Sequence, residues 1–191
     1  AEISDGVPNF TIETMEHGLG TTVPRFIKRF YLMTDGFRLR WQPADEEADS
    51  RGGAVQLFDF ATVFDSWLDS LWATGEGIDE ETGDFLWSLR GFDGAVEPSA
   101  ERMTVFCVEE GEYPTFDLFL HDLETHESRL LSVDFYTYLD TLLETRGAFG
   151  WVHLLADGDP DDEPLDKSFS EHFRRTMQTY FPDADLGLFD G

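Results

Sequence analysis

The chain has 191 residues, with 40 Asp and Glu against 13 Lys and Arg, which gives a formal net charge of -27 at pH 7. Disordered acidic chains are poor in aromatic residues, whereas 15% of this chain is aromatic and 41% is hydrophobic, so composition and length predict one folded domain. The charge disfavours nucleic acid and anionic lipid as partners, because phosphate binding depends on clustered Lys and Arg, and it favours a basic protein partner.

Residue periodicity predicts the elements of the first half of the chain. The predicted elements are a helix over 22–33, a strand over 37–41, an acidic loop over 43–53, a short strand over 55–58 and a helix over 60–72. Thr22 and Pro24 mark the start of the first helix, Gly36 marks its stop, and Asp59 is expected to cap the second. Residues 73–101 combine acids with glycines and predict a long acidic loop, in which a short apolar piece at 85–89 is fixed to the body.

The second half predicts an antiparallel meander followed by helices. Its predicted elements are strands over 103–108, 115–121 and 129–133, a helix after residue 134, a turn or strand over 149–155 and an amphipathic helix over 169–180. Asp134 is expected to cap the helix that follows it. We therefore expect an α+β fold with a central antiparallel sheet flanked by helices, acidic loop insertions and a C-terminal helical extension.

The order of these parts resembles the SUKH superfamily of Smi- and Knr-type proteins. The resemblance rests on a helix that begins at Val23-Pro24, an Asp35-Gly36 stop, the strand with Trp41, and Asp122-Leu123 before a turn. The opening of the next helix, with Phe135, Tyr138 and Leu139, belongs to the same pattern. The chain departs from the family in having Val before the Pro, where Leu is more frequent, and Asp before the Gly, where Asn is more frequent.

The resemblance covers a core of about 8–146 and leaves 147–191 as an extension packed on it, within one domain of 1–191. It implies an α+β fold with no shared catalytic site. Bacterial members are commonly immunity proteins that bind a cognate toxin, often a nuclease, and fungal members are scaffolds in cell-wall signalling. The contact residues vary with the toxin, so the resemblance assigns no residue of this chain to an interface.

Clusters of acids mark the candidate partner-binding surface. Residues 43–101 hold 15 acids against Arg51 and Arg90, and 157–163 hold five acids in seven residues. Trp87, within the acidic insertion, is a candidate anchor for a partner. The predicted partner-binding residues are Asp45, Glu46, Glu47, Asp49, Glu76, Asp79, Glu80, Glu81, Asp84, Trp87, Asp157, Asp159, Asp161 and Asp162. A solvated surface or adaptation to high salt would give the same composition.

The sequence predicts no catalytic, cofactor or metal site. Asp157, Asp159 and Asp161 have the spacing of a calcium loop, but the Gly and Glu that such a loop requires are missing. His121 and His126 would ligate a metal only if a turn brought them together with Asp122, and we interpret both as hairpin residues. The single cysteine, Cys107, excludes a disulfide framework. We expect it to be a core thiol.

Residues 25–40 form a basic island of Arg25, Lys28, Arg29, Arg38 and Arg40 against Asp35 alone. We interpret the island chiefly as an internal counter-ion surface for the acidic loops, and the alternative is a binding surface for an anion or an acidic partner. The leading hypothesis is a non-enzymatic cytoplasmic immunity protein that occludes the active site of a basic toxin. The cytoplasmic location is expected because no signal peptide or anchor is visible in the first twenty residues. The alternatives are a regulatory scaffold of the same fold and an acidic DNA mimic.

Overall fold

The structure is a computed structural model that describes residues 1–44, 51–65, 80–94, 102–108, 116–156 and 164–189. Its strands are β1 (Glu2–Ile3), β2 (Phe37–Trp41), β3 (Gly53–Leu57), β4 (Leu89–Asp93), β5 (Arg102–Val108), β6 (Phe116–Asp122) and β7 (Ser128–Leu130). Its helices are α1 (Asn9–Leu19), α2 (Arg25–Met33), α3 (Phe60–Phe64), α4 (Glu80–Ser88), α5 (Phe135–Thr145) and α6 (Pro164–Tyr180), with short 3-10 turns η2 (Trp151–Leu154) and η3 (Gly187–Phe189).

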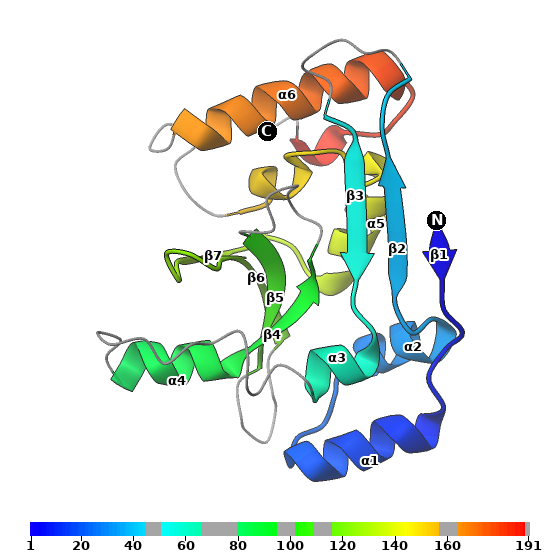
Figure 1. The fold of residues 1–191 in the computed structure, drawn as a ribbon, viewed down its shortest axis with the longest axis vertical. Helices are drawn as coiled ribbons and strands as arrows, with labels where there is room; N and C mark the ends of the chain where they lie inside the picture. The colour runs from blue at the N-terminus through cyan, green and yellow to red at the C-terminus, as the bar shows by residue number, and fades with distance from the viewer. Residues whose placement is uncertain (45–50, 66–79, 95–101, 109–115, 157–163, 190–191) are drawn as a thin grey trace.

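The described strands form one antiparallel sheet in which strands adjacent in the chain are adjacent in space, in the order β1 to β7. The sheet is strongly twisted, and its two ends face different helices (Figure 1). The hairpin of β2 and β3 stands in the foreground with α5 behind it, α6 crosses one end of this hairpin, and α2 and α3 lie at the other end (Figure 1). The expected α+β class with a central antiparallel sheet is confirmed.

The sheet opens between β3 and β4, which share a single registered pair, Leu57 with Asp93. A register shift between Gly91 and Asp93 accompanies the opening. Beyond it, β3 pairs instead with a distant segment, since Gly53 forms a bridge with Ala148. The sheet therefore consists of two half-sheets, β1–β3 and β4–β7, that meet at Asp93.

Asp93 is buried, and its carboxylate joins the two half-sheets. One oxygen accepts a hydrogen bond from the backbone N–H of Gln56 in β3 (3.1 Å), and the other accepts from the Tyr138 hydroxyl of α5 (3.0 Å). The Tyr138 hydroxyl also lies 2.9 Å from the Thr104 hydroxyl of β5. Burial, together with the charge of Asp93, raises the pKa of Tyr138 well above its ordinary value. The buried carboxylate thus takes the place of a strand–strand hydrogen bond at the opening.

The β4–β7 half-sheet is covered on both faces. On one face, Phe106 and Leu118 belong to the main core with Tyr138 of α5 and Trp151 of η2. On the other face, α4 buries Leu86 in a second cluster. The members of this second cluster are Leu86, Leu89, Met103, Val105 and Cys107. Cys107 is therefore a buried core thiol, as predicted.

The main core continues into the C-terminal segment. Phe173 and Met177 of α6 are fully buried, and Phe189 of η3 packs with them in the same cluster. The ring of Phe189 lies 5.3 Å from that of Phe173, between centroids.

In the described ranges, no helix has both the length and the apolarity that crossing a bilayer requires.

Capping by acidic side chains fixes two of the predicted helix starts. Asp59 accepts from the backbone N–H of Thr62 in α3, and Asp134 accepts from that of Thr137 in α5 (2.8 Å in each case). The predicted helix at 22–33 and the strand at 37–41 are confirmed, as are the meander strands and the last helix. Part of the helix predicted over 60–72 lies outside the described residues.

Two features of the fold differ from the sequence prediction. The predicted acidic loop over 73–101 contains a helix, α4, and a strand, β4, so its apolar residues are periodic parts of regular elements. The helix α1 was not predicted, because it starts after Pro8 without a side-chain cap and leaves its first large apolar residue, Phe10, 69% exposed. A helix is predicted from apolar residues that recur at helical spacing on its buried side, and an apolar residue that faces solvent falls outside this spacing.

Candidate functional site

The structure brings together only a small part of the predicted partner-binding set. Glu80 and Glu81 lie in the first turn of α4, and Asp84 and Trp87 follow in the same helix. Ten predicted residues lie outside the described ones, and their arrangement stays a prediction. These are Asp45, Glu46, Glu47, Asp49, Glu76, Asp79, Asp157, Asp159, Asp161 and Asp162.

The outer side of α4, which we call the α4 surface, is defined by Asp84 and Trp87. Both side chains are exposed, Trp87 by 44% of its area, and they lie three residues apart, so they are neighbours on the helix. The opposite side of α4 is anchored, since Leu86 is buried and the Phe85 ring lies 5.8 Å from that of Phe119 in β6, between centroids. An exposed Trp beside a carboxylate on a rigid helix has the composition of a binding hot spot.

The end of α4 is held by hydrogen bonds to its last carbonyl groups. The Arg90 guanidinium donates to the Trp87 carbonyl (2.6 Å), and the Ser88 hydroxyl donates to the Phe85 carbonyl (2.6 Å). Cationic donors at a helix C-terminus satisfy carbonyls that lack an intrahelical partner. The backbone that carries Trp87 is therefore fixed to the β4 strand that follows it.

The negative charge is distributed unevenly along the sequence. Residues 43–101 hold 15 acids against two bases, whereas residues 25–40 hold five bases against one acid. Between described residues, two ion pairs form, Lys28 with Glu16 and Arg102 with Asp122.

Several arginines of the body serve packing and capping. The Arg51 guanidinium lies 4.5 Å from the centre of the Phe149 ring, and that of Arg146 lies 4.3 Å from the centre of the Phe181 ring. The Arg174 guanidinium donates to the Phe189 carbonyl (3.1 Å). These contacts bind arginine to aromatic faces and to a backbone carbonyl, and leave most acids without a described basic neighbour.

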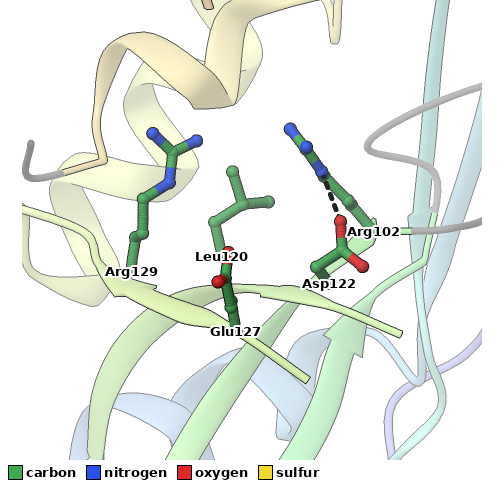
Figure 2. A pocket seen from close by; sticks show the side chains of 5 residues that line it. All are labelled: Arg102, Leu120, Asp122, Glu127 and Arg129. Carbon is green, nitrogen blue, oxygen red and sulfur yellow. Dashed lines mark hydrogen bonds and ion pairs between the residues drawn. The ribbon is translucent and has the colours of Figure 1, made fainter. Parts of the chain in front are cut away.

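A small pocket lies on the β5–β7 face of the sheet, and we call it the arginine pocket. It is lined by Arg102 of β5, Leu120 and Asp122 of β6, Glu127 of the following turn and Arg129 of β7. Figure 2 shows Arg102 and Arg129 rising from β5 and β7, the strands on either side of β6, with Leu120 of β6 between them. Cross-strand register explains this arrangement, because Asp122 pairs with Arg102, and Leu120 pairs with Arg129.

Three hydrogen-bonded contacts fix the arginine pocket. The Arg102 Nε donates to the Asp122 carboxylate (2.9 Å), and the guanidinium groups of Arg102 and Arg129 each lie 3.5 Å from Nδ1 of His153 in η2. Burial acts to raise the pKa of Asp122, but the Thr125 N–H, the Arg102 side chain and the Glu124 N–H hold it below its ordinary value. The pocket holds about 40 Å³, far less than the several hundred Å³ of a typical small-molecule site. This charge cluster joins η2 to the sheet and is too small for an organic substrate.

The sequence prediction did not include the arginine pocket. Arg102 is the first residue of β5 and Arg129 is the middle residue of the three-residue strand β7, so neither position carries a pattern in the sequence that could have identified the pocket. His153 carries no signal either, because its position depends on the ring of Phe169 in α6, against which it stacks at 4.4 Å between centroids.

The hairpin between β6 and β7 brings together the two histidines that the sequence analysis considered. The rings of His121 and His126 stack with centroids 6.3 Å apart, and Nδ1 of His121 lies 2.8 Å from the Ser128 hydroxyl. Burial, and then the proximity of His126, lowers the pKa of His121 to about 4. Asp122 lies on the opposite face of β6 from His121, where it accepts a hydrogen bond from Arg102. The described residues contain no group of three or more potential metal ligands.

The basic island is described, but most acids of the loops that it was predicted to neutralise lie outside the described residues. Lys28 pairs with Glu16, whereas Arg25, Arg29, Arg38 and Arg40 are exposed and form neither a hydrogen bond nor an ion pair through their side chains with any described residue. The role of the island as a counter-ion surface for the acidic loops therefore stays a prediction. Arg25 and Arg29 lie on α2, and Arg38 and Arg40 lie on β2.

Comparisons with known proteins leave the family of this chain open. No protein-family model matches it, and neither the curated proteins nor the solved structures contain a match.

Proposed function

We propose that the protein is a non-enzymatic binding protein that holds a basic protein partner, in the manner of an immunity protein that neutralises a basic toxin by covering its active site. The observation that carries the proposal is Trp87, a 44% exposed aromatic side chain beside Asp84 on the anchored helix α4. The excess of acids over bases supports a basic partner, because opposite fields speed association.

Two further features support the proposal. The arginine pocket holds about 40 Å³, and its arginines contact Asp122 and His153 of the fold itself, which is the geometry of a structural contact. The order of helices and strands that resembles the SUKH superfamily supports the same class of function. The proposal places the binding in the cytoplasm, where a single buried thiol such as Cys107 stays reduced.

The test is affinity capture from the native host with the wild-type protein and with a Trp87→Ala variant. We expect one basic protein to be captured, with an affinity that falls as the salt concentration rises and that drops about 30-fold in the Trp87→Ala variant. Tyr136→Ala is the matched control, because Tyr136 is an aromatic residue of α5 with 52% exposure and lies outside the α4 surface. It should bind the partner as the wild type does.

The purified partner then separates immunity from the other functions. Stoichiometric addition of the protein should abolish the partner's activity, measured as nuclease activity where the partner is a nuclease. Binding that leaves the activity intact would show a scaffold, and capture of several unrelated basic proteins in competition with DNA would show a DNA mimic. Capture of an acidic partner, or equal binding by the Trp87→Ala variant, would contradict the assignment of the α4 surface.

A further inference from the structure

Helix α5 carries a second apolar stripe on the side that faces solvent. Its buried side includes Tyr138 and Leu142. On the other side, Tyr136 is 52% exposed, Leu143 is 65% exposed, and Leu139 between them is half-buried. We call these three residues the α5 seam. Their alternating spacing of three and four residues is that of an apolar contact line between two packed helices.

The α5 seam begins next to the basic helix α2. The Phe26 ring of α2 lies 5.9 Å from the Tyr136 ring and 5.5 Å from the Phe135 ring, between centroids. Helix α2 therefore packs beside the first turn of α5. Arg29 lies three residues after Phe26, so the two side chains are neighbours on the helix, and the Arg29 side chain is exposed. This end of the seam is basic.

The other end of the α5 seam is acidic. Glu144 follows Leu143 directly, in the last turn of α5. Asp140 lies near the middle of the helix, and the helical repeat puts it on the opposite flank of the seam from Leu139. Both acids are exposed, and their carboxylates form neither a hydrogen bond nor an ion pair with any described residue. The charge therefore changes sign along α5, from Arg29 beside its first turn to Glu144 in its last turn.

This change of sign selects the occupant of the seam. A basic partner would meet Arg29 as a like charge, and an acidic partner would meet Glu144 as a like charge. A second copy, turned by a two-fold axis across the middle of α5, instead places its Glu144 against Arg29. The same rotation brings Leu143 of one copy onto Tyr136 of the other and keeps the two Asp140 side chains on opposite flanks. The surface is therefore complementary to itself.

From this geometry we infer that the α5 seam is the interface of a two-fold dimer, in which the two α5 helices pack antiparallel and Arg29 of each copy pairs with Glu144 of the other. The interface is separate from the α4 surface, because α4 and α5 cover opposite faces of the β4–β7 half-sheet. The inference therefore does not depend on the proposed function.

Two physical terms set the strength of this dimer. The net charge of -27 makes two copies repel each other, and about 0.15 M salt screens this repulsion beyond about 8 Å. A seam of two helical turns is also smaller than a standard protein interface, so we expect a weak dimer that forms at about 0.1 mM and above. At the lower concentrations of affinity capture the protein is a monomer.

The test is sedimentation equilibrium of the full chain in about 0.15 M salt, from about 10 µM to about 1 mM protein. The wild type should pass from monomer to dimer across this range. Leu143→Gln removes the most exposed residue of the seam and should leave a monomer throughout. Leu130→Gln is the matched control, because Leu130 is a leucine of β7 with 40% exposure and lies outside the seam. It should dimerise as the wild type does.

Exchange of charges tests the orientation of the two copies. Arg29→Glu brings two acids together and should weaken the dimer about tenfold. Arg38→Glu makes the same change in net charge on β2 and should keep the affinity within about twofold of the wild type. The double variant Arg29→Glu/Glu144→Arg has the wild-type net charge and opposite charges at the contact, so it should recover the dimer.

Four outcomes would each overturn the inference. They are a wild-type monomer at about 1 mM, a dimer in the Leu143→Gln variant, equal losses in Arg29→Glu and Arg38→Glu, and no recovery in the double variant. All the substituted side chains are exposed, so each variant should keep the urea midpoint of the wild type at low protein concentration. That measurement separates a lost interface from a lost fold.

Discussion

Arginine has opposite surroundings in the two half-sheets. In β4–β7, Arg102 and Arg129 lie beneath η2, and their guanidinium groups meet the Asp122 carboxylate or the His153 ring. In β1–β3, Arg38 and Arg40 occupy alternating positions of one strand, β2, and both are exposed. The difference lies in the covering element, since only the first pair has a helical turn above it.

This contrast shows where the molecule uses its few bases. Where an element covers the sheet, arginine is half-buried and has charged or aromatic neighbours that hold the element in place. In β2, arginine is exposed and has no hydrogen-bonded or ion-paired neighbour among the described residues. The surroundings of an arginine side chain on this sheet therefore depend on whether an element covers it.

We expect the largest effect on stability at the contact between the two half-sheets. Asp93→Ala leaves the Gln56 N–H and the Tyr138 hydroxyl without their acceptor, and we expect the free energy of unfolding to fall by about 3 kcal/mol. Urea denaturation measures this loss. Asp117→Ala, which removes an exposed acid of β6, is the control and should change stability by less than about 0.5 kcal/mol. Equal effects of the two variants would show that Asp93 does not join the half-sheets.

The stability of the β4–β7 half-sheet should also depend on pH, through His121. Its pKa is about 4 in the folded protein and about 6.5 in the unfolded chain, so the unfolded state binds the proton first as the pH falls. The histidine therefore contributes stability that is present above pH 6.5 and is lost toward pH 4. Between pH 7 and pH 5 the loss should be about 2 kcal/mol.

The His121→Gln variant isolates this contribution from the protonation of the many carboxylates. The variant should show a weaker fall in unfolding free energy between pH 7 and pH 5 than the wild type, and NMR titration of the His121 ring should give a midpoint near 4. A midpoint near 6.5 would show that the ring is accessible to water in the folded protein.

The smallest expected effects concern the arginines themselves. Arg102→Gln removes the donor to a half-buried carboxylate and should cost about 1.5 kcal/mol of unfolding free energy. Arg38→Gln removes an exposed side chain that has no hydrogen-bonded neighbour among the described residues and should cost less than about 0.5 kcal/mol. Comparable losses in urea denaturation would remove the distinction between the arginines of the two half-sheets.

Most of the fold follows from residue spacing, because long periodic segments bury one face. The aromatic stripe of α2 and the alternation of β2 were sufficient to predict both elements, and Asp134 predicted the start of α5. The helix α4 was missed, because Gly83 and its acids obscured the short apolar pair of Phe85 and Leu86. Those two residues become a buried face only when β5 and β6 provide a surface for them.

The candidate site was less accessible to sequence reasoning. Trp87 was singled out because it stood among acids, and the structure places its side chain at the surface beside Asp84. Arg38 and Arg102 both lie in strands, and the sequence does not show that their surroundings differ. Their different surroundings depend on η2, which is distant in the chain and folds over one strand face alone.

The meander has a kinetic consequence. Since neighbouring strands are neighbours in the chain, the pairs β2–β3, β4–β5, β5–β6 and β6–β7 form by closing short loops, which favours fast folding for a sheet protein. The bridge of Gly53 with Ala148 instead closes a loop of roughly 95 residues at a much larger entropic cost. Folding should therefore end with the segment around Ala148 closing against β3, after the hairpins on both sides have formed.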